Sequence, residues 1–137
     1  MKGLLIGIVL LLTVFLGTAC SKDEEPLQYS DFEHIEHWDD LDRLTGDKTI
    51  IYYYDPFCDI CIKLEDEVTF LLDAIADDIE IYLIDAGYIS EQGEPPFEVF
   101  GTVPSLIIFY EQSFEKWVRG SNPTLDYLRN TRDGLQE

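Results

Sequence analysis

Two cysteines separated by two residues are the groups in this sequence best suited to chemistry. Cys58 and Cys61 stand between a run of β-forming residues (49–54) and a segment with helical periodicity that begins near Cys58. At the first turn of a helix, residues three apart share a face, so the two sulfurs can meet as thiols or as a disulfide. The unpaired N–H groups and positive dipole end of the helix favour a thiolate at Cys58. The pattern indicates a site of thiol–disulfide exchange.

The elements that hold this motif are predicted by hydrophobic periodicity. Residues 49–54 lack polar alternation, which is typical of a central strand buried on both faces. The helix after the motif has one apolar side, and residues 79–85 form a second strand. Two strands joined by a helix predict a right-handed βαβ unit with parallel strands. The apolar side of the helix consists of Cys61, Leu64, Val68, Leu71, Leu72 and Ile75.

The C-terminal part predicts a long connection, a hairpin and a helix. Residues 86–102 form the connection, with a short helical turn at 96–100. Val103 and Pro104 lead directly into a strand at 105–110, and a turn joins it to an antiparallel strand at 114–119. The last helix is predicted to begin with Asn122 as N-cap and Pro123 at its first position, and to end before Gly134.

Residues 30–33 fit a capping box, so a further helix is predicted to begin at Asp31 and to end at Gly46. His34 and His37 lie one turn apart in it and could pair on a metal, but the sequence places no third ligand beside them. We interpret both as surface histidines and predict no metal site. The apolar residues at helical spacing are Phe32, Ile35, Trp38, Leu41 and Leu44.

Residues 1–19 form a predicted targeting segment, in which Lys2 precedes an uncharged apolar run too short for a comfortable membrane span. The small residues before Cys20 resemble the bacterial lipoprotein signal, although Gly17 stands where leucine is usual. This resemblance implies membrane anchoring through a lipidated Cys20. The polar, charged residues that follow, interrupted by Pro26, predict a tether over 20–29 before a domain over 30–137. An ordinary cleaved signal and an uncleaved anchor are the alternatives, and all three place the domain outside the cytoplasm, where disulfides persist.

The charge is strongly acidic: 9 Lys and Arg against 28 Asp and Glu give a net charge of −19 over 137 residues. Such a surface repels nucleic acid and anionic lipid headgroups, so we expect no nucleic-acid partner. We interpret it as a solvated acidic surface that favours neutral or basic protein partners, and we expect one monomeric domain.

The chain resembles the thioredoxin superfamily over residues 30–135. The resemblance rests on the Cys58–Cys61 motif and on the Thr-Val-Pro-Ser sequence at 102–105 before a strand–hairpin–helix ending. It implies an α/β fold with a central four-stranded mixed sheet flanked by helices. It also implies that Pro104 is cis beside the sulfurs and that Val103 offers its backbone to an extended substrate. Cys58 would then be the exposed nucleophile and Cys61 the buried resolving thiol. We expect Phe57, Phe100, Val103 and Pro104 to form an apolar rim for an unfolded or extended substrate, with core packing as the alternative for Phe100.

Three departures from thioredoxins proper indicate a divergent member with a specialised partner. Tryptophan before the first cysteine and glycine-proline after it are replaced here by Phe57, Asp59 and Ile60. The family's buried acid in the preceding strand is replaced by Tyr52, which cannot take a proton near neutral pH. The connection before Pro104 is also long.

Asp55 and Asp59 are predicted to tune the redox chemistry, because their negative charge opposes a second anion at Cys58. We therefore expect a reducing couple, closer to about −270 than to about −120 mV. Beyond the redox-active disulfide Cys58–Cys61 we expect no cofactor. The expected partners are protein thiols or disulfides and an unidentified electron donor or acceptor. The alternatives are a non-catalytic thioredoxin-fold binding module on the cell surface and a thiolate metal carrier, for which the sequence offers only two ligands.

Overall fold

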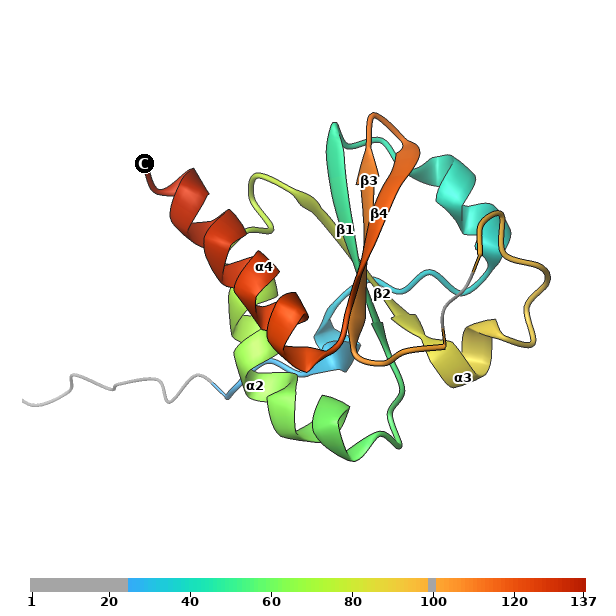
Figure 1. Cartoon of the computed structure of the whole chain (residues 1–137), viewed down its shortest axis with the longest axis horizontal. Helices are drawn as coiled ribbons and strands as arrows, with labels where there is room; N and C mark the ends of the chain where they lie inside the picture. Colours follow the sequence, from blue (N-terminus) through green and yellow to red (C-terminus); the bar gives the residue numbers. More distant parts are fainter. Residues whose placement is uncertain (1–24, 99–100) are drawn as a thin grey trace, which may run out of the picture.

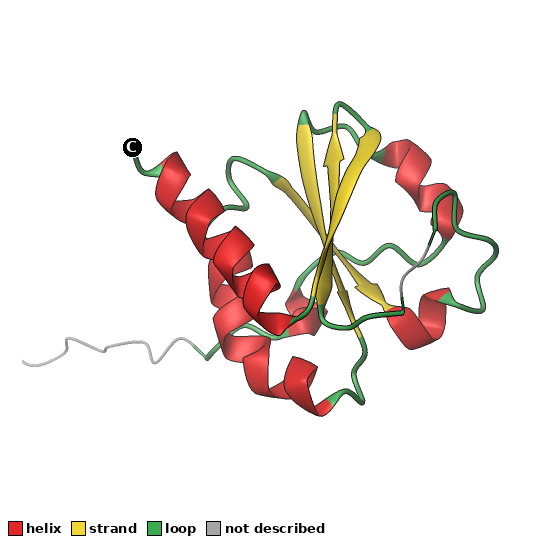
Figure 2. Cartoon of the chain, in the orientation of Figure 1, coloured by secondary structure: helices red, strands yellow, loops and turns green. Residues whose placement is uncertain are grey.

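A sheet of four strands in the order β2-β1-β3-β4 organises the fold (Figure 2). β1 (Lys48–Tyr54) pairs in parallel with β2 (Glu80–Asp85) and antiparallel with β3 (Ser105–Tyr110), which forms a hairpin with β4 (Ser113–Arg119). The predicted four-stranded mixed sheet is thus confirmed. The computed structural model describes residues 25–98 and 101–137, so the predictions for the signal peptide, Cys20 and Phe100 lie outside the described residues.

Two long helices cover one face of the sheet. α2 (Asp59–Asp73) and α4 (Ser121–Leu135) lie side by side there, while the short helices η2 (Trp38–Arg43) and α3 (Ala86–Ile89) lie on the other side (Figure 1). In β1, Ile50 and Tyr52 belong to the core under α2 and α4, whereas Ile51 and Tyr53 belong to the core on the opposite face. This alternation follows the two-residue period of a strand. β1 is therefore buried on both faces, as predicted. Within the described residues no helix is long and apolar enough to cross a bilayer.

The helix predicted from Asp31 to Gly46 is wrong. Two separate 3-10 helices, η1 (Tyr29–Asp31) and η2, occupy this stretch, and the chain between them is extended. The extended part pairs with the free edge of β2, because the Ile35 N–H donates to the Leu83 carbonyl and the Leu83 N–H donates to the Glu33 carbonyl, each at 2.9 Å. Pairing with β2 gives backbone N–H and carbonyl groups of both segments a hydrogen-bond partner. This stabilisation outweighs the preference of the apolar pattern for a helix.

The buried apolar residues of this stretch fit a 3-10 helix better than an α-helix. Trp38, Leu41 and Leu44 are three residues apart and are 4%, 8% and 3% exposed. A 3-10 helix has three residues per turn, so this spacing places all three on one line facing the sheet.

Two smaller predictions in the C-terminal half are corrected. α4 begins one residue before the predicted N-cap: its N-cap is Gly120, whose φ of 94° is open to glycine at little cost. Pro123 therefore stands within the first turn, where its missing N–H costs no hydrogen bond. Residues 96 and 97 form a bend rather than a helical turn, and the long connection opens instead with the helix α3, which the sequence did not predict.

The Glu80 carboxylate fixes the loop that leads into β1. It accepts hydrogen bonds from the backbone N–H groups of Thr45 (3.2 Å) and Gly46 (3.0 Å) and from the Thr49 hydroxyl (2.6 Å). Gly46 is required by this close approach, because a Cβ there would lie 2.9 Å from the Cβ of Glu80. Partial burial opposes the charge of Glu80, but the hydrogen bonds from Thr49, Gly46 and Thr45 outweigh it and lower its pKa.

We expect Glu80→Gln to lower the free energy of unfolding by about 1–2 kcal/mol at pH 7, because charge-assisted hydrogen bonds are lost. A carboxylate with a depressed folded-state pKa stabilises above its ordinary pKa, and this contribution is lost as the pH falls. The difference between variant and wild type should therefore shrink towards pH 4. Urea unfolding at both pH values measures it, with Glu91→Gln at an exposed site as the control. An equal difference at pH 7 and pH 4 would contradict the role of the charge.

Candidate active site

The two sequence motifs meet at one edge of the sheet. β1 ends at Tyr54, and the antiparallel register pairs Tyr53 with Ser105, the first residue of β3. The loop that follows β1 and the Val103–Pro104 pair that precedes β3 therefore leave the sheet at the same end. Figure 1 shows this end below the sheet, where the chain turns from β1 into α2. The tertiary structure thus brings together residues that are 40 or more positions apart in sequence.

The loop before α2 is shaped by Asp55. Its carboxylate oxygen Oδ1 accepts from the Phe57 N–H at 2.8 Å, and its carbonyl accepts from the Cys58 N–H at 3.1 Å. These bonds turn the chain so that Cys58 becomes the N-cap of α2 and Asp59 its first residue. Asp55 is half-buried and Asp59 is exposed. Asp55 thus has a structural role in the loop, and the effect of both carboxylates on redox chemistry stays a prediction.

The two cysteines have different environments. Both are free thiols; Cys58 is half-buried, whereas Cys61 is 0% exposed. Burial raises the pKa of Cys61 to about 12; a hydrogen bond from the Asp55 backbone acts the other way, and the neighbouring Cys58 raises it further. A half-exposed thiol at a helix N-terminus beside a buried, protonated thiol is the arrangement expected of an attacking and a resolving cysteine.

The loop before β3 is held firmly against the sheet. The Val103–Pro104 peptide bond is cis, Val103 is half-buried and Pro104 is buried. The Pro104 carbonyl accepts from the Gly120 N–H at 3.0 Å. Behind it, the Ser105 hydroxyl donates to the Thr102 carbonyl at 2.9 Å and accepts from Trp117 Nε1 at 2.7 Å. The backbone at Val103 is therefore presented on a rigid support.

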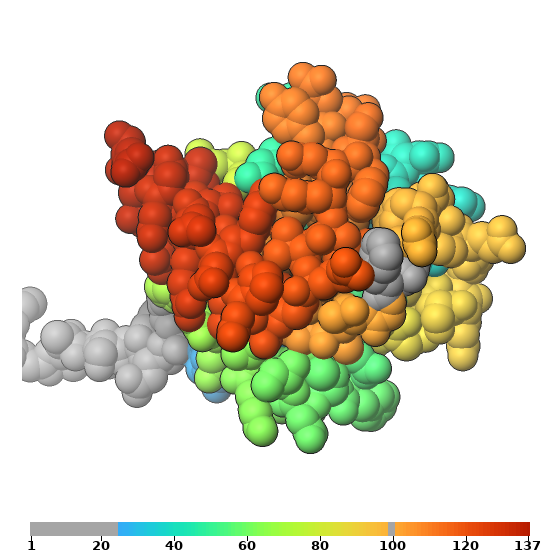
Figure 3. Space-filling model, viewed as in Figure 1, coloured from blue at the N-terminus to red at the C-terminus, as the bar shows by residue number. Residues whose placement is uncertain are grey.

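Exposed apolar side chains surround the motif. Phe57 is 91% exposed, and Ile60 and Ile62 are 41% and 54% exposed. In Figure 3 the green residues at the start of α2 project from the lower edge of the molecule. Of these three residues the sequence pointed only to Phe57 as part of an apolar rim. The signal for the other two was the apolar pair at 60 and 62, which flanks the buried Cys61 on the helix and must point away from the core.

Two tyrosines lie behind the buried thiol. Tyr52 is 0% exposed, and its hydroxyl lies 3.0 Å from that of Tyr29, which donates to the Cys61 carbonyl at 2.7 Å. Burial raises the pKa of both tyrosines far above its ordinary value. Both hydroxyls therefore stay protonated near neutral pH, and neither can take a proton from Cys61, as predicted for Tyr52. Tyr29, the last residue of the predicted tether, is 6% exposed and belongs to the core.

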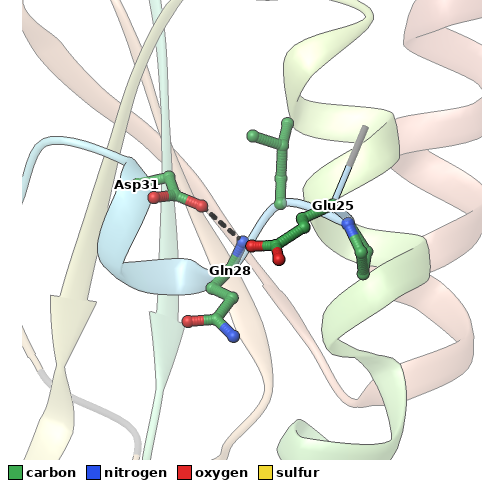
Figure 4. Close-up of a pocket in the computed structure, with 5 residues that line it drawn as sticks. Glu25, Gln28 and Asp31 are labelled. Atoms are coloured by element: carbon green, nitrogen blue, oxygen red, sulfur yellow. Dashed lines mark hydrogen bonds between the residues drawn. The ribbon is translucent and has the colours of Figure 1, made fainter. Parts of the chain in front are cut away.

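Two hollows lie near the N-terminal segment and the motif. One of about 210 Å³ opens beside the cysteine loop and is lined by residues that include Tyr29, Pro56 and Ile62. Another of about 740 Å³ lies along residues 25–31, where the Asp31 carboxylate accepts from the Gln28 N–H (Figure 4). The larger hollow is lined by N-terminal residues alone, whereas the smaller one borders the loop that leads into Cys58.

The histidines differ from each other. His34 is half-buried, and its Nε2 lies 2.9 Å from the Tyr54 hydroxyl, so it is at the surface only in part. His37 is exposed, with its Nδ1 3.9 Å from the Asp39 carboxylate. Over residues 25–98 and 101–137, no group of three His, Cys, Asp or Glu side chains could hold a metal ion.

Comparison with known proteins gives matches in structure only. No protein-family model matches the chain, and no curated protein matches its sequence. Mitochondrial thioredoxin 3 from Saccharomyces cerevisiae is similar in structure with a TM-score of 0.64 at 20% identity, covering 77% of this chain and 97% of that one. Thioredoxins from Plasmodium falciparum (TM-score 0.60, 13% identity) and Fasciola hepatica (0.59, 17%) each cover 74% of this chain and 97% of their own. The chain therefore has a thioredoxin-like fold, as its two motifs predicted.

Proposed function

We propose that this protein is a thiol–disulfide oxidoreductase that acts through Cys58 and Cys61. The observation that carries the proposal is the pairing of a half-buried thiol at the N-cap of α2 with a fully buried thiol three residues later, at the sheet edge that also holds cis Pro104. The thioredoxin-like fold supports the same chemistry. Asp55, which shapes the loop, and Val103, which is presented on the rigid loop before β3, are the positioning elements.

The exchange proceeds in two steps. The Cys58 thiolate attacks one sulfur of a substrate disulfide, so that a mixed disulfide forms and the other substrate sulfur leaves as a thiol. Cys61 then loses its proton and attacks the Cys58 sulfur, which forms the Cys58–Cys61 disulfide and releases the second substrate thiol. The substrate disulfide gains two electrons and the protein dithiol loses two. A separate dithiol donor returns the protein to its reduced form.

Substrate contact is assigned to the apolar surface around Cys58. Phe57, Ile60 and Ile62 would pack against an extended or unfolded polypeptide, and the backbone at Val103 would pair with it as an added strand. The acidic surface favours neutral or basic protein substrates. We further propose that the protein acts outside the cytoplasm as a membrane-anchored bacterial lipoprotein, attached through Cys20, and that it acts as a monomer.

The direction of transfer is proposed to be reducing, and the equilibrium reduction potential tests it. We expect a Cys58–Cys61 potential near about −270 mV, measured by thiol trapping in glutathione or dithiothreitol buffers. The full chain with Cys20→Ser is the sample, so that only the motif cysteines can react. A potential above about −170 mV would overturn the reducing direction, since strongly oxidising couples lie near −120 mV. A pair that never titrates would overturn the exchange function and favour a binding module.

A further inference from the structure

Tyr29 lies in a short segment, residues 27–31, that packs along α2. We call this segment the strap. Asp31 closes it: its carboxylate accepts from the Gln28 N–H at 2.8 Å, and its own N–H donates to the Gln28 carbonyl at 3.0 Å (Figure 4). The closed turn limits the freedom of Tyr29, which stands inside it.

The strap is bonded to three successive turns of α2. The Tyr29 hydroxyl donates to the Cys61 carbonyl at 2.7 Å, and the Tyr29 N–H donates to Glu65 Oε1 at 2.8 Å. One turn further on, the Thr69 hydroxyl lies 3.1 Å from the Leu27 carbonyl and 2.8 Å from the Glu65 carbonyl of its own helix. Cys61, Glu65 and Thr69 are four residues apart, so they lie on one face of the helix. Tyr29 thus bonds to both ends of the helical turn that begins at the buried cysteine.

The hydrogen bonds behind Cys61 run in one direction. The Tyr29 hydroxyl has a single proton and gives it to the Cys61 carbonyl, so Tyr52 must be the donor in the bond between the two hydroxyls. Tyr52 is anchored in the central strand, and its ring centroid lies 5.2 Å from that of Tyr29. The centroid of the Tyr29 ring also lies 4.5 Å from that of the Tyr54 ring. The clamp on Cys61 is therefore tied to the most buried part of the sheet.

We propose that Tyr29 is a positioning residue for the second step of exchange: by holding the Cys61 carbonyl, it keeps the buried thiol in place to attack the Cys58 sulfur. This inference rests on the proposed function. The first step needs only the Cys58 thiolate at the helix N-cap, which Tyr29 does not contact through any hydrogen bond among the described residues. The second step needs a fixed distance and direction between two sulfurs, which a loosened first turn would spoil. A loss of positioning therefore slows closure and also makes the closed disulfide less stable.

Tyr29→Phe tests the proposal, because it keeps the ring and removes only the hydroxyl. The probe is an aromatic disulfide that releases a coloured thiolate at each step, mixed with the reduced full chain carrying Cys20→Ser in a stopped-flow instrument. We expect an unchanged first phase and a second phase slowed about three- to tenfold, the rate equivalent of one hydrogen bond. The dithiol–disulfide equilibrium should shift towards the dithiol by a similar factor.

Tyr54→Phe is the matched control. Tyr54 is as buried as Tyr29 (7% against 6%), but its hydroxyl pairs with His34 and not with the cysteine helix. The double variant Tyr29→Phe, Tyr52→Phe removes the hydroxyl that Tyr29→Phe leaves unpaired, so it should regain stability while the second phase stays slow. A second phase unchanged within twofold in Tyr29→Phe, or equally slow in Tyr54→Phe, would overturn the positioning role. Absence of both phases in the wild type would instead overturn the proposed function.

Discussion

Replacing Cys58 by serine is expected to reduce thiol–disulfide exchange to the rate of the buffer alone. Replacing Cys61 by serine should stop the exchange at the mixed disulfide between Cys58 and the substrate. A serine hydroxyl is not ionised near neutral pH, so the first variant has no nucleophile at the helix N-cap. The second variant keeps the half-buried Cys58 thiol and loses only the group that resolves the mixed disulfide. Reduction of a disulfide-bonded protein, followed by mass spectrometry of trapped adducts, separates the two outcomes.

Both variants should be made in the full chain with Cys20→Ser, which removes the remaining cysteine and serves as the active control. The expected pattern is no adduct with Cys58→Ser and a stable one-to-one adduct with Cys61→Ser. Unfolding of each variant in urea checks that the fold is kept. If Cys58→Ser retained activity, or if Cys61→Ser turned over like the control, the assignment of attacking and resolving thiols would be wrong.

The closing step is expected to accelerate about tenfold for each pH unit, or about a hundredfold between pH 7 and pH 9. Cys61 must be a thiolate to attack the Cys58 sulfur, and burial raises its pKa to about 12. Below that pKa the thiolate fraction rises tenfold per unit. Tyr52 and Tyr29, the hydroxyls behind Cys61, cannot take the proton in this range because burial raises the pKa of both. The rate of the second coloured phase against pH measures the effect.

The pH range of this experiment is set by the stability of the fold. A thiol whose pKa is raised on folding contributes stability that is full below its unfolded-state pKa and is lost as the pH rises towards the folded-state value. For Cys61 that loss falls between about pH 9 and about pH 12, so rates should be compared at pH 9 and below. A profile that reaches a plateau between pH 7 and pH 8 would show that another group takes the proton, and would refute unassisted closure.

The strands and the cysteine helix could be predicted from local sequence because their signals are short-range. β1 is a run of apolar and aromatic residues with no polar alternation, and such a run is stable only between two covered faces. The apolar side of α2, from Cys61 to Leu72, repeats at the period of a helix and is buried as that pattern requires, with only Leu64 half-buried. Ile75, two residues past the end of the helix, is buried as well. The placement of Cys58 at the start of that helix follows from the same pattern.

The segment before β1 could not be predicted in the same way. Its apolar residues and capping box are compatible with a helix, but the outcome depended on the free edge of β2, which lies more than 40 residues later in the chain. Leu83 lies on that edge. Its N–H donates to the carbonyl of residue 33, and its carbonyl accepts from the N–H of residue 35. The local sequence pattern does not contain information about such a distant partner. Backbone pairing with β2 therefore overrides the helix propensity of this segment.

The residues that could do the chemistry can be recognised in the sequence: a cysteine pair at a helix start, and a valine-proline pair before a strand. How these residues are held depends on contacts between distant parts of the chain. The antiparallel register of β1 and β3 sets Pro104 at the same edge as Cys58. The contact between the Tyr29 hydroxyl and Cys61 joins residues 32 positions apart, from a stretch whose composition predicted only a tether. Contacts of this kind follow from how elements pack, because burying Tyr29 against Tyr52 satisfies both hydroxyls at once.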